Sequence, residues 1–184
     1  MLILASQSPR RQALLKAMDL DFQVMVKSVD ETFPKDIPVE KTAEYLAEKK
    51  ADAFHFSELP KNAILITCDT TVIVDNQILG KAETPDEAVI MLKKLSGRKH
   101  AVITGVCIKT ATEKKLFSET TFVHFKHLTD EQIQYYVGTY KPFDKAGAYG
   151  IQEWIGMIGI SRIEGCYYNV MGLPTARLAE MLNV

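Results

Sequence analysis

Residues 2–15 read LILASQSPRRQALL, an apolar strand-like run followed at once by a helix start. The apolar run ends at Ser6. Ser8 can cap the helix, because a serine oxygen accepts hydrogen bonds from the backbone N–H groups that the first turn leaves free. Pro9 suits the first helical position, and residues 12–15 continue the helix. The stretch therefore predicts a strand, a short loop and a helix.

Two arginines follow the proline, in the first turn of this helix. Arg10 and Arg11 stand where the helix macrodipole is already positive, so the helix itself does not favour cations there. Backbone N–H groups, serine hydroxyls and guanidinium groups together suit a phosphate chain. The pair therefore indicates an anion site. The alternative is a capped surface helix whose arginines point into solvent.

Composition restricts the class of protein. The chain has 184 residues, which suits one domain or two closely joined lobes. Its formal net charge is −1, so no overall charge attracts it to nucleic acid or to a membrane surface. The first eight residues lack the charged start and the cleavage site of a signal peptide, and no apolar run reaches membrane-spanning length. Cys68, Cys107 and Cys166 show no disulfide or metal spacing. We expect a cytoplasmic protein with reduced thiols and no nucleic-acid or membrane partner.

The rest of the chain alternates helical and strand-like patterns. Apolar spacing predicts helices over 39–54, 85–96, 129–138 and 174–182. β-rich runs predict strands over 22–26, 63–68, 71–74, 78–79, 101–109 and 118–128. Residues 141–172 are rich in glycine and are expected to form loops with short strands. The interspersed elements predict an α/β or α+β fold with a mixed sheet.

Asp69 is the strongest candidate for chemistry in the middle of the chain. It stands between two apolar β-rich runs, where a carboxylate is costly to bury unless a cation or a metal pairs with it. Hydroxyls at Thr67, Thr70 and Thr71 could hydrogen-bond it or a ligand. The alternative is an aspartate that only turns the chain, as Asp75 is expected to do. The apolar surroundings favour a functional carboxylate.

Three other charged positions fit a phosphate or metal site. Lys81 follows a glycine that permits close backbone approach, so it could reach phosphate, although a solvated loop lysine is the plainer interpretation. Lys50 shares a helical face with Leu46, an inward position for a cation. Glu31 follows Asp30 after a predicted strand, and paired acids could bind a hard cation such as Mg²⁺. The alternative for the acids is a polar loop.

The segment 143–152, FDKAGAYGIQ, gathers small, charged and amide residues. Gln152 offers a donor and an acceptor together, which suits the edge of a nucleobase. Residues 167–169 and 172–174 add an aromatic wall and another amide. Glycine and tyrosine also cluster in many structural loops, so each of these features is weak alone.

Taken together, these stretches resemble the Maf family. The matching segments occur in the family's order and span nearly the whole chain: SQSPRR over 6–11, DT over 69–70, GK over 80–81, FDKAGAYGIQ over 143–152 and YYNVMGLP over 167–174. The resemblance implies a nucleoside triphosphate pyrophosphatase that uses a divalent metal, Mg²⁺ or Mn²⁺. It also implies a single domain over 1–184 with a fold like that of inosine triphosphate pyrophosphatases. In that fold an elongated mixed sheet is flanked by helices, with a cleft between two lobes. A homodimer is what the family suggests.

The resemblance also implies a substrate and a set of roles. Asp-Thr and the FDKAGAYGIQ loop are typical of the branch that cleaves dTTP and UTP, whereas the 7-methyl-GTP branch usually has Asp-Gln at the first site. By motif, Asp69 carries over as the proton acceptor. A separate hypothesis is that Asp69, together with Glu31, holds the divalent metal, and whether Asp69 acts as base, ligand or both stays open. The specificity positions are Arg11, Thr70 and Gln152. The positions expected to hold phosphate or metal are Ser6, Arg10, Glu31, Lys50 and Lys81.

This chain departs from the family's usual pattern at Cys68, Ala82, Lys141 and Glu153, and none of these changes removes an assigned group. Lys141 and Glu153 flank the proposed base-reading loop and could alter turnover or substrate range. Two other functions stay open. One keeps the chemistry on a purine such as 7-methyl-GTP or inosine triphosphate. The other is a nucleotide-binding regulator of cell division without turnover, because the family is associated with inhibition of septum formation.

Overall fold

The structure is a computed structural model that describes residues 1–184 and contains a mixed sheet with helices around it. The strands are β1 (Leu2–Leu4), β2 (Phe22–Val24), β3 (Ile64–Val74), β4 (Gln77–Leu79), β5 (Lys99–Lys109), β6 (Lys114–Phe125) and β7 (Ile160–Glu164). The helices are α1 (Pro9–Ala17), α2 (Thr42–Asp52), α3 (Pro85–Leu95), α4 (Asp130–Tyr140), α5 (Trp154–Gly159), α6 (Tyr167–Met171) and α7 (Thr175–Leu182). The strand order is β2-β1-β3-β5-β6-β7, and β4 pairs with β3. Parallel pairs of β1 and antiparallel pairs of β4 and β7 confirm the predicted mixed sheet.

The chain divides into two compact units. Unit 1 comprises residues 1–70, 104–119 and 172–184, and unit 2 comprises residues 71–103 and 120–171. Three boundaries between the units fall inside strands: after Thr70 in β3, after Ile103 in β5 and after Glu119 in β6. The cleft expected between two lobes stays a prediction. None of the helices has the length and apolar character that crossing a bilayer requires.

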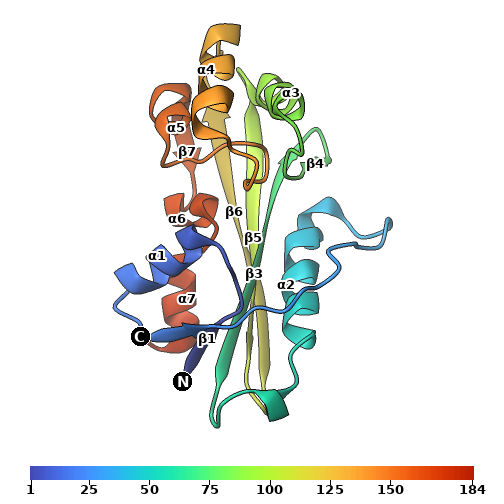
Figure 1. The fold of residues 1–184 in the computed structure, drawn as a ribbon, viewed down its shortest axis with the longest axis vertical. Coiled ribbons are helices and arrows are strands. Elements are labelled where there is room, and N and C mark those ends of the chain that lie inside the picture. Colours follow the sequence, from blue (N-terminus) through green and yellow to red (C-terminus); the bar gives the residue numbers. More distant parts are fainter. The chain divides into compact units, whose positions relative to one another are not determined.

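Unit 1 begins as the opening stretch predicts. β1 pairs in parallel with β2 and with β3, and the Ser8 side chain caps α1 by accepting from the backbone N–H of Arg11, with Pro9 at the helix start. A small apolar core joins β1, β3 and α2, with Ile3, Ala47 and Leu65 among its members. Within this unit, Figure 1 shows α2 on one side of the strands and α1 and α7 on the other.

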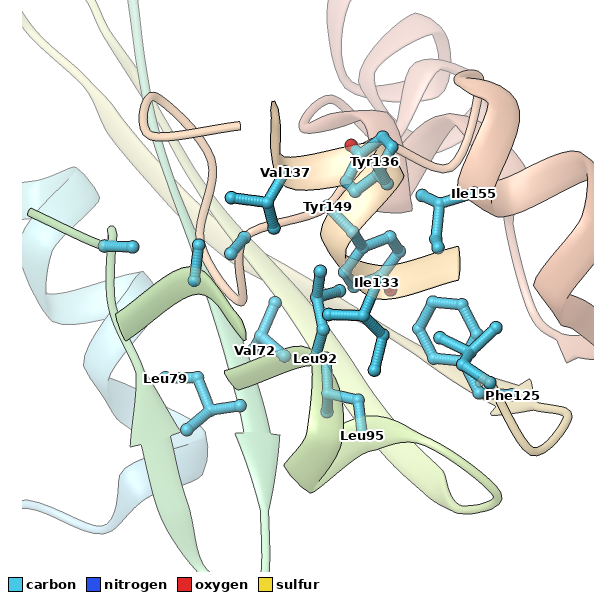
Figure 2. Close-up of a cluster of buried hydrophobic side chains, with 14 of the residues drawn as sticks. Val72, Leu79, Leu92, Leu95, Phe125, Ile133, Tyr136, Val137, Tyr149 and Ile155 are labelled. Atoms are coloured by element: carbon cyan, nitrogen blue, oxygen red, sulfur yellow. The ribbon is translucent and has the colours of Figure 1, made fainter. Parts of the chain in front are cut away.

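Unit 2 has a larger core, shown in Figure 2. Leu92 and Leu95 of α3 pack with Ile133 and Tyr136 of α4 and with Phe125 of β6, and all five are buried. Both long helices start at threonine caps. The Thr84 side chain caps α3, and Thr129 forms a capping box with Gln132 at the start of α4. Capping fixes where each helix begins and therefore which face it turns to the core.

Two sequence-based expectations are wrong. β3 runs unbroken through Asp69, which was expected to separate two strands. The 141–172 segment was expected to be loops with short strands, yet it contains α5 and α6 as well as β7. Its glycines lie where a side chain would collide: a Cβ on Gly156 would be 2.0 Å from the carbonyl oxygen of Ile151, and one on Gly159 would be 2.8 Å from Leu128. Close packing, rather than loop flexibility, explains the glycines of α5.

Candidate active site

Asp69 and Lys50 are brought together by the way α2 lies on β3. Alternate residues of a strand share a face, so Thr67 and Asp69 point the same way. The Thr67 hydroxyl donates to the backbone oxygen of Ala47 at 2.5 Å, which fixes α2 on this face. Three residues further along the helix, Lys50 lies on the same side as Ala47. Its Nζ donates to Oδ1 of Asp69 at 2.6 Å. An ion pair therefore makes an aspartate tolerable inside the strand.

Lys50 also holds a second carboxylate. Its Nζ lies 2.8 Å from Oε1 of Glu31, which comes from the loop after β2. The side chains of Lys50 and Asp69 are 17% and 13% exposed, whereas that of Glu31 is 54% exposed. One ammonium thus contacts a largely buried and an exposed carboxylate. The low exposure of the Lys50 side chain confirms the inward position predicted for it. The Asp30 carboxylate does not contact Lys50; it accepts from the backbone N–H of Thr32 and lies 3.6 Å from Nζ of Lys49.

The pKa of Asp69 is raised above its ordinary value. Burial is the largest cause, because it disfavours the charged form. The nearby cations Lys50 and Arg11 lower the pKa, and the negative charge of Glu31 raises it. A carboxyl whose pKa is raised is a stronger proton acceptor than an ordinary aspartate, which suits a general base.

Arg11 is fixed by three acceptors. Nε donates to the backbone oxygen of Gly172 at 2.8 Å, Nη1 to Oγ of Ser6 at 3.2 Å, and Nη2 to Oγ1 of Thr70 at 3.0 Å. Thr70 in turn shares a hydrogen bond of 2.9 Å with the buried Thr104. A guanidinium group carries five N–H donors, so two of them are left for a ligand. The predicted residues Ser6, Arg11 and Thr70 therefore form one connected group, and Arg10 is half-buried beside Arg11 on α1.

A cavity of about 190 Å³ opens beside this group. Its polar lining includes Ser6, Arg11, Glu31 and Lys50, which all belong to unit 1. Cys68 also lines it, and burial raises the pKa of this thiol to about 11, so it stays protonated. Three cations, Arg11, Lys27 and Lys50, a hydroxyl and backbone from the loop before α1 make the cavity suitable for an anionic group.

The carboxylates fit a hard divalent cation. The structure gathers no group of three or more His, Cys, Asp or Glu side chains that could hold a metal. Mg²⁺, however, is commonly bound through one or two carboxylates, with waters and substrate phosphates completing its shell. Asp69 and Glu31 converge on a single ammonium and supply only oxygen donors. This donor set fits Mg²⁺ or Mn²⁺ and does not fit a thiolate-bound metal.

The remaining predicted residues, Lys81 and Gln152, lie in unit 2. The exposed Lys81 forms an isolated antiparallel bridge with Ala146, and the Gly147 N–H donates to the backbone oxygen of Gly80 at 3.0 Å. The GK and FDKAGAYGIQ motifs are thus adjacent. The Oε1 atom of Gln152 is buried and has no hydrogen-bond partner within the protein. A buried acceptor without a partner is costly, which favours a ligand that supplies a donor.

Sequence reasoning missed a buried polar network around this loop. Lys145 is only 8% exposed, and its Nζ lies 3.1 Å from Oε1 of Glu153. The other oxygen of Glu153 accepts from the hydroxyl of Tyr136, a residue of α4. The sequence marked Glu153 as a departure from the family's usual glycine that could alter turnover or substrate range, but it gave no partner for this residue. The signal that could have found the network is the adjacent pair of opposite charges, Asp144 and Lys145, inside a segment of mostly small and apolar residues.

Comparison with known proteins shows which family this chain resembles. A family profile described as Maf-like protein matches residues 1–184. A curated protein of Flavobacterium johnsoniae named dTTP/UTP pyrophosphatase is 50% identical over 181 residues, covering 98% of this chain and 93% of its own. Proteins with the same name from Porphyromonas gingivalis and Bacteroides thetaiotaomicron are 50% and 47% identical, covering 98% and 96% of this chain and 92% of each relative. The solved structure of the Staphylococcus aureus Ham1 protein has a TM-score of 0.45 and 18% identity, over 67% of this chain and 71% of that one.

Proposed function

Because this chain belongs to the Maf-like protein family, we propose that it hydrolyses dTTP and UTP to the nucleoside monophosphate and pyrophosphate. The relatives named for this activity match it over nearly their full length. The structural observation that carries the proposal is the contact of Lys50 with both Asp69 and Glu31 beside a cationic cavity. A site that only bound phosphate would gain nothing from two carboxylates, which repel it.

The triphosphate is held by cations and short polar groups. Arg11 keeps two guanidinium donors free of protein acceptors, and Ser6 lies against the same cavity. Lys50 places a second positive charge at the cavity wall, and Lys27 places a third. Arg10 and Lys81 are assigned to phosphate by the family motif. Because these donors are arranged before the substrate arrives, they stabilise negative charge that develops in the transition state.

Asp69 accepts the proton of the attacking water. Its raised pKa matches this role, and Lys50 holds the carboxyl in one orientation. Water attacks the α-phosphorus, the bond to the bridging oxygen breaks, and pyrophosphate leaves with its charge neutralised by the arginine and lysine side chains. Asp69 and Glu31 would hold the divalent metal, which when bound supplies positive charge to the phosphate oxygens.

Gln152 selects the base. Its buried Oε1 is an acceptor without a partner, and thymine and uracil offer an imino N–H that cytosine lacks. Hydrogen bonding to this donor would satisfy the amide oxygen. Cytosine has an acceptor lone pair at the same ring nitrogen, so an amide oxygen aimed at that atom would be repelled and stay unpaired. Thr70, fixed by Arg11 and Thr104, is the second specificity position.

A panel of nucleoside triphosphates at equal concentration, with Mg²⁺ and with Mn²⁺, tests the proposal. The assay identifies each product and measures its amount. Fast conversion of dTTP and UTP to monophosphate and pyrophosphate is expected. Preferential turnover of 7-methyl-GTP or inosine triphosphate would contradict the pyrimidine assignment, and tight binding without product would indicate a regulator instead. The family resemblance further supports a cytoplasmic homodimer, which cell fractionation and light scattering would test.

A further inference from the structure

Gln152 lies in a turn that is closed by backbone hydrogen bonding. The N–H of Glu153 donates to the carbonyl oxygen of Gly150 at 3.0 Å, so residues 150–153 form a tight turn. Glu153 then precedes the first residue of α5 with an extended backbone. The conformation of this turn therefore sets the direction in which the Gln152 side chain leaves the chain.

Tyr136 ties both ends of the turn together. Its side chain is fully buried in the core of unit 2, on α4. The hydroxyl accepts the N–H of Gly150 at 3.0 Å and donates to Oε2 of Glu153. Burial and the neighbouring Glu153 raise the pKa of Tyr136, so the hydroxyl keeps the proton that it donates. A rigid helix thus contacts the residues that enclose Gln152 (Figure 2 shows Tyr136 among the core side chains).

Lys145 neutralises the carboxylate of Glu153. Its Nζ lies 3.1 Å from Oε1 of Glu153 and 2.7 Å from Oδ1 of Asp144. The Glu153 side chain is 20% exposed, so its charge needs such a partner. The carboxylate also packs on Gly150, where an added Cβ would lie 2.8 Å from Cδ of Glu153. Glu153 is therefore held from three directions.

We propose that Glu153 is a positioning residue, and that Tyr136 and Lys145 hold it so that the Gln152 amide is aimed at the base before substrate binds. This inference rests on the proposed function, in which Gln152 reads the base. A buried acceptor discriminates well only if it cannot turn away from the wrong base. A network that fixed only the fold would stabilise the protein without affecting which base is accepted.

The test uses Glu153→Gln and Tyr136→Phe in the full-length chain. Glu153→Gln keeps the size of the side chain and removes the charge, and Tyr136→Phe removes only the hydroxyl. For each variant, kcat and KM are measured with dTTP, UTP, dCTP and CTP. We expect the preference for dTTP over dCTP, as a ratio of kcat/KM, to fall about tenfold, because the amide loses its fixed orientation. Most of the loss should be in turnover of dTTP and UTP, since a misplaced substrate reacts slowly even when bound.

Tyr135→Phe is the matched control. Tyr135 neighbours Tyr136 on α4, but it is 53% exposed and takes no part in the turn. The same chemical change there should leave the base preference unchanged. A double variant gives a second readout. Adding Glu153→Gln to Gln152→Ala should cost no further discrimination, because the amide to be positioned is already absent.

The outcomes separate this inference from the proposed function. If the wild-type protein does not hydrolyse dTTP and UTP, the proposed function is wrong and the inference falls with it. If the wild type does so, but Glu153→Gln and Tyr136→Phe keep its base preference, only the positioning role is wrong. Additive losses in the double variant would overturn it as well. Should Tyr136→Phe fail to fold, Glu153→Gln and Lys145→Met carry the same test.

Discussion

The guanidinium of Arg11 donates through Nη2 to Oγ1 of Thr70 at 3.0 Å, joining residues that are 59 positions apart in the chain. The contact links the N-terminal turn of α1 to the middle of β3. Both residues were assigned by family motif as specificity positions, and their direct contact couples the orientation of one side chain to that of the other. Arg11 therefore orients Thr70, and under the proposed function its remaining donors are available to phosphate.

Arg11→Lys should lower the catalytic activity although it keeps the positive charge. A lysine has one nitrogen and cannot reach Gly172, Ser6 and Thr70 together, so acceptors in the cavity wall lose their partner. We expect kcat/KM for dTTP to fall at least about tenfold, from about 1.4 kcal/mol of lost transition-state stabilisation. Steady-state kinetics measure this. Arg162→Lys, whose side chain on β7 is 68% exposed, is the control and should retain full activity. Equal activity in both variants would contradict the role of Arg11.

Asp69→Asn should abolish turnover with little effect on folding. Asparagine has nearly the same shape but cannot accept a proton from water at neutral pH. We expect kcat to fall by about a hundredfold or more. Pyrophosphate release from dTTP and UTP measures the loss, and circular dichroism checks the fold. Near-normal turnover would exclude Asp69 as the proton acceptor.

Lys50→Met should also reduce kcat, for an electrostatic reason. Without the ammonium, the carboxylates of Asp69 and Glu31 repel each other and the buried one loses its counter-charge. We expect about a hundredfold loss, comparable to removing one charge-stabilising donor from an active site. Lys41→Met is the control, because Lys41 is 59% exposed and pairs only with Glu44. If both methionine variants behave alike, the loss does not come from the Asp69 contact.

Removal of divalent metal by a chelator should stop the reaction, and added Mg²⁺ or Mn²⁺ should restore it. Glu31→Gln should then require more metal for half-maximal rate, because one charged oxygen ligand is replaced by a neutral one. The exposed position of Glu31 makes a folding defect unexpected. Titration of the rate with Mg²⁺ measures the shift. An unchanged metal requirement would remove Glu31 from the ligand set.

The helix starts were predictable because local chemistry fixes them. Ser8, Thr84 and Thr129 cap helices as their sequence contexts indicate. The unbroken course of β3 through Asp69 was not predictable, since it depends on an ammonium supplied by α2. A contact with distant residues also explains why α5 was not predicted. Its glycines read locally as loop signals, and only the close approach of Ile151 and Leu128 explains them.

The site shows the same division between local and long-range causes. The motifs identified Asp69, Arg11 and Gln152, but the sequence carries no sign that Arg11 reaches Gly172 or Thr70. Those contacts depend on how distant segments pack. From the sequence, Glu153 was a departure from the family pattern beside the base-reading loop, without a known partner. Its contacts with Lys145 and Tyr136 depend on how α4 packs against the loop, which the sequence does not reveal.

The buried His100 should make stability depend on pH. Its Nε2 bonds to the Tyr149 hydroxyl at 2.7 Å, its ring stacks on Phe125, and burial lowers its pKa to about 3, with the nearby His124 contributing. In the unfolded chain the pKa of histidine is about 6.5. Between these values the unfolded chain binds a proton that the folded chain does not. The free energy of unfolding should therefore fall as pH drops below about 6.5, by up to about 1.4 kcal/mol per pH unit.

His100→Gln tests this dependence, because glutamine can keep a hydrogen bond to Tyr149 but has no charge to gain. Urea unfolding at a series of pH values between about 7 and 4.5 gives the free energy of unfolding for both proteins, in the range where histidine titrates. The variant should be less stable than wild type near neutral pH and should lose stability more slowly on acidification. His127→Gln, at an exposed position, should keep the wild-type slope. Since carboxylates titrate alike in all three proteins, a difference in slope confined to His100→Gln reports the buried imidazole, and parallel slopes would show that it is protonated in the folded state.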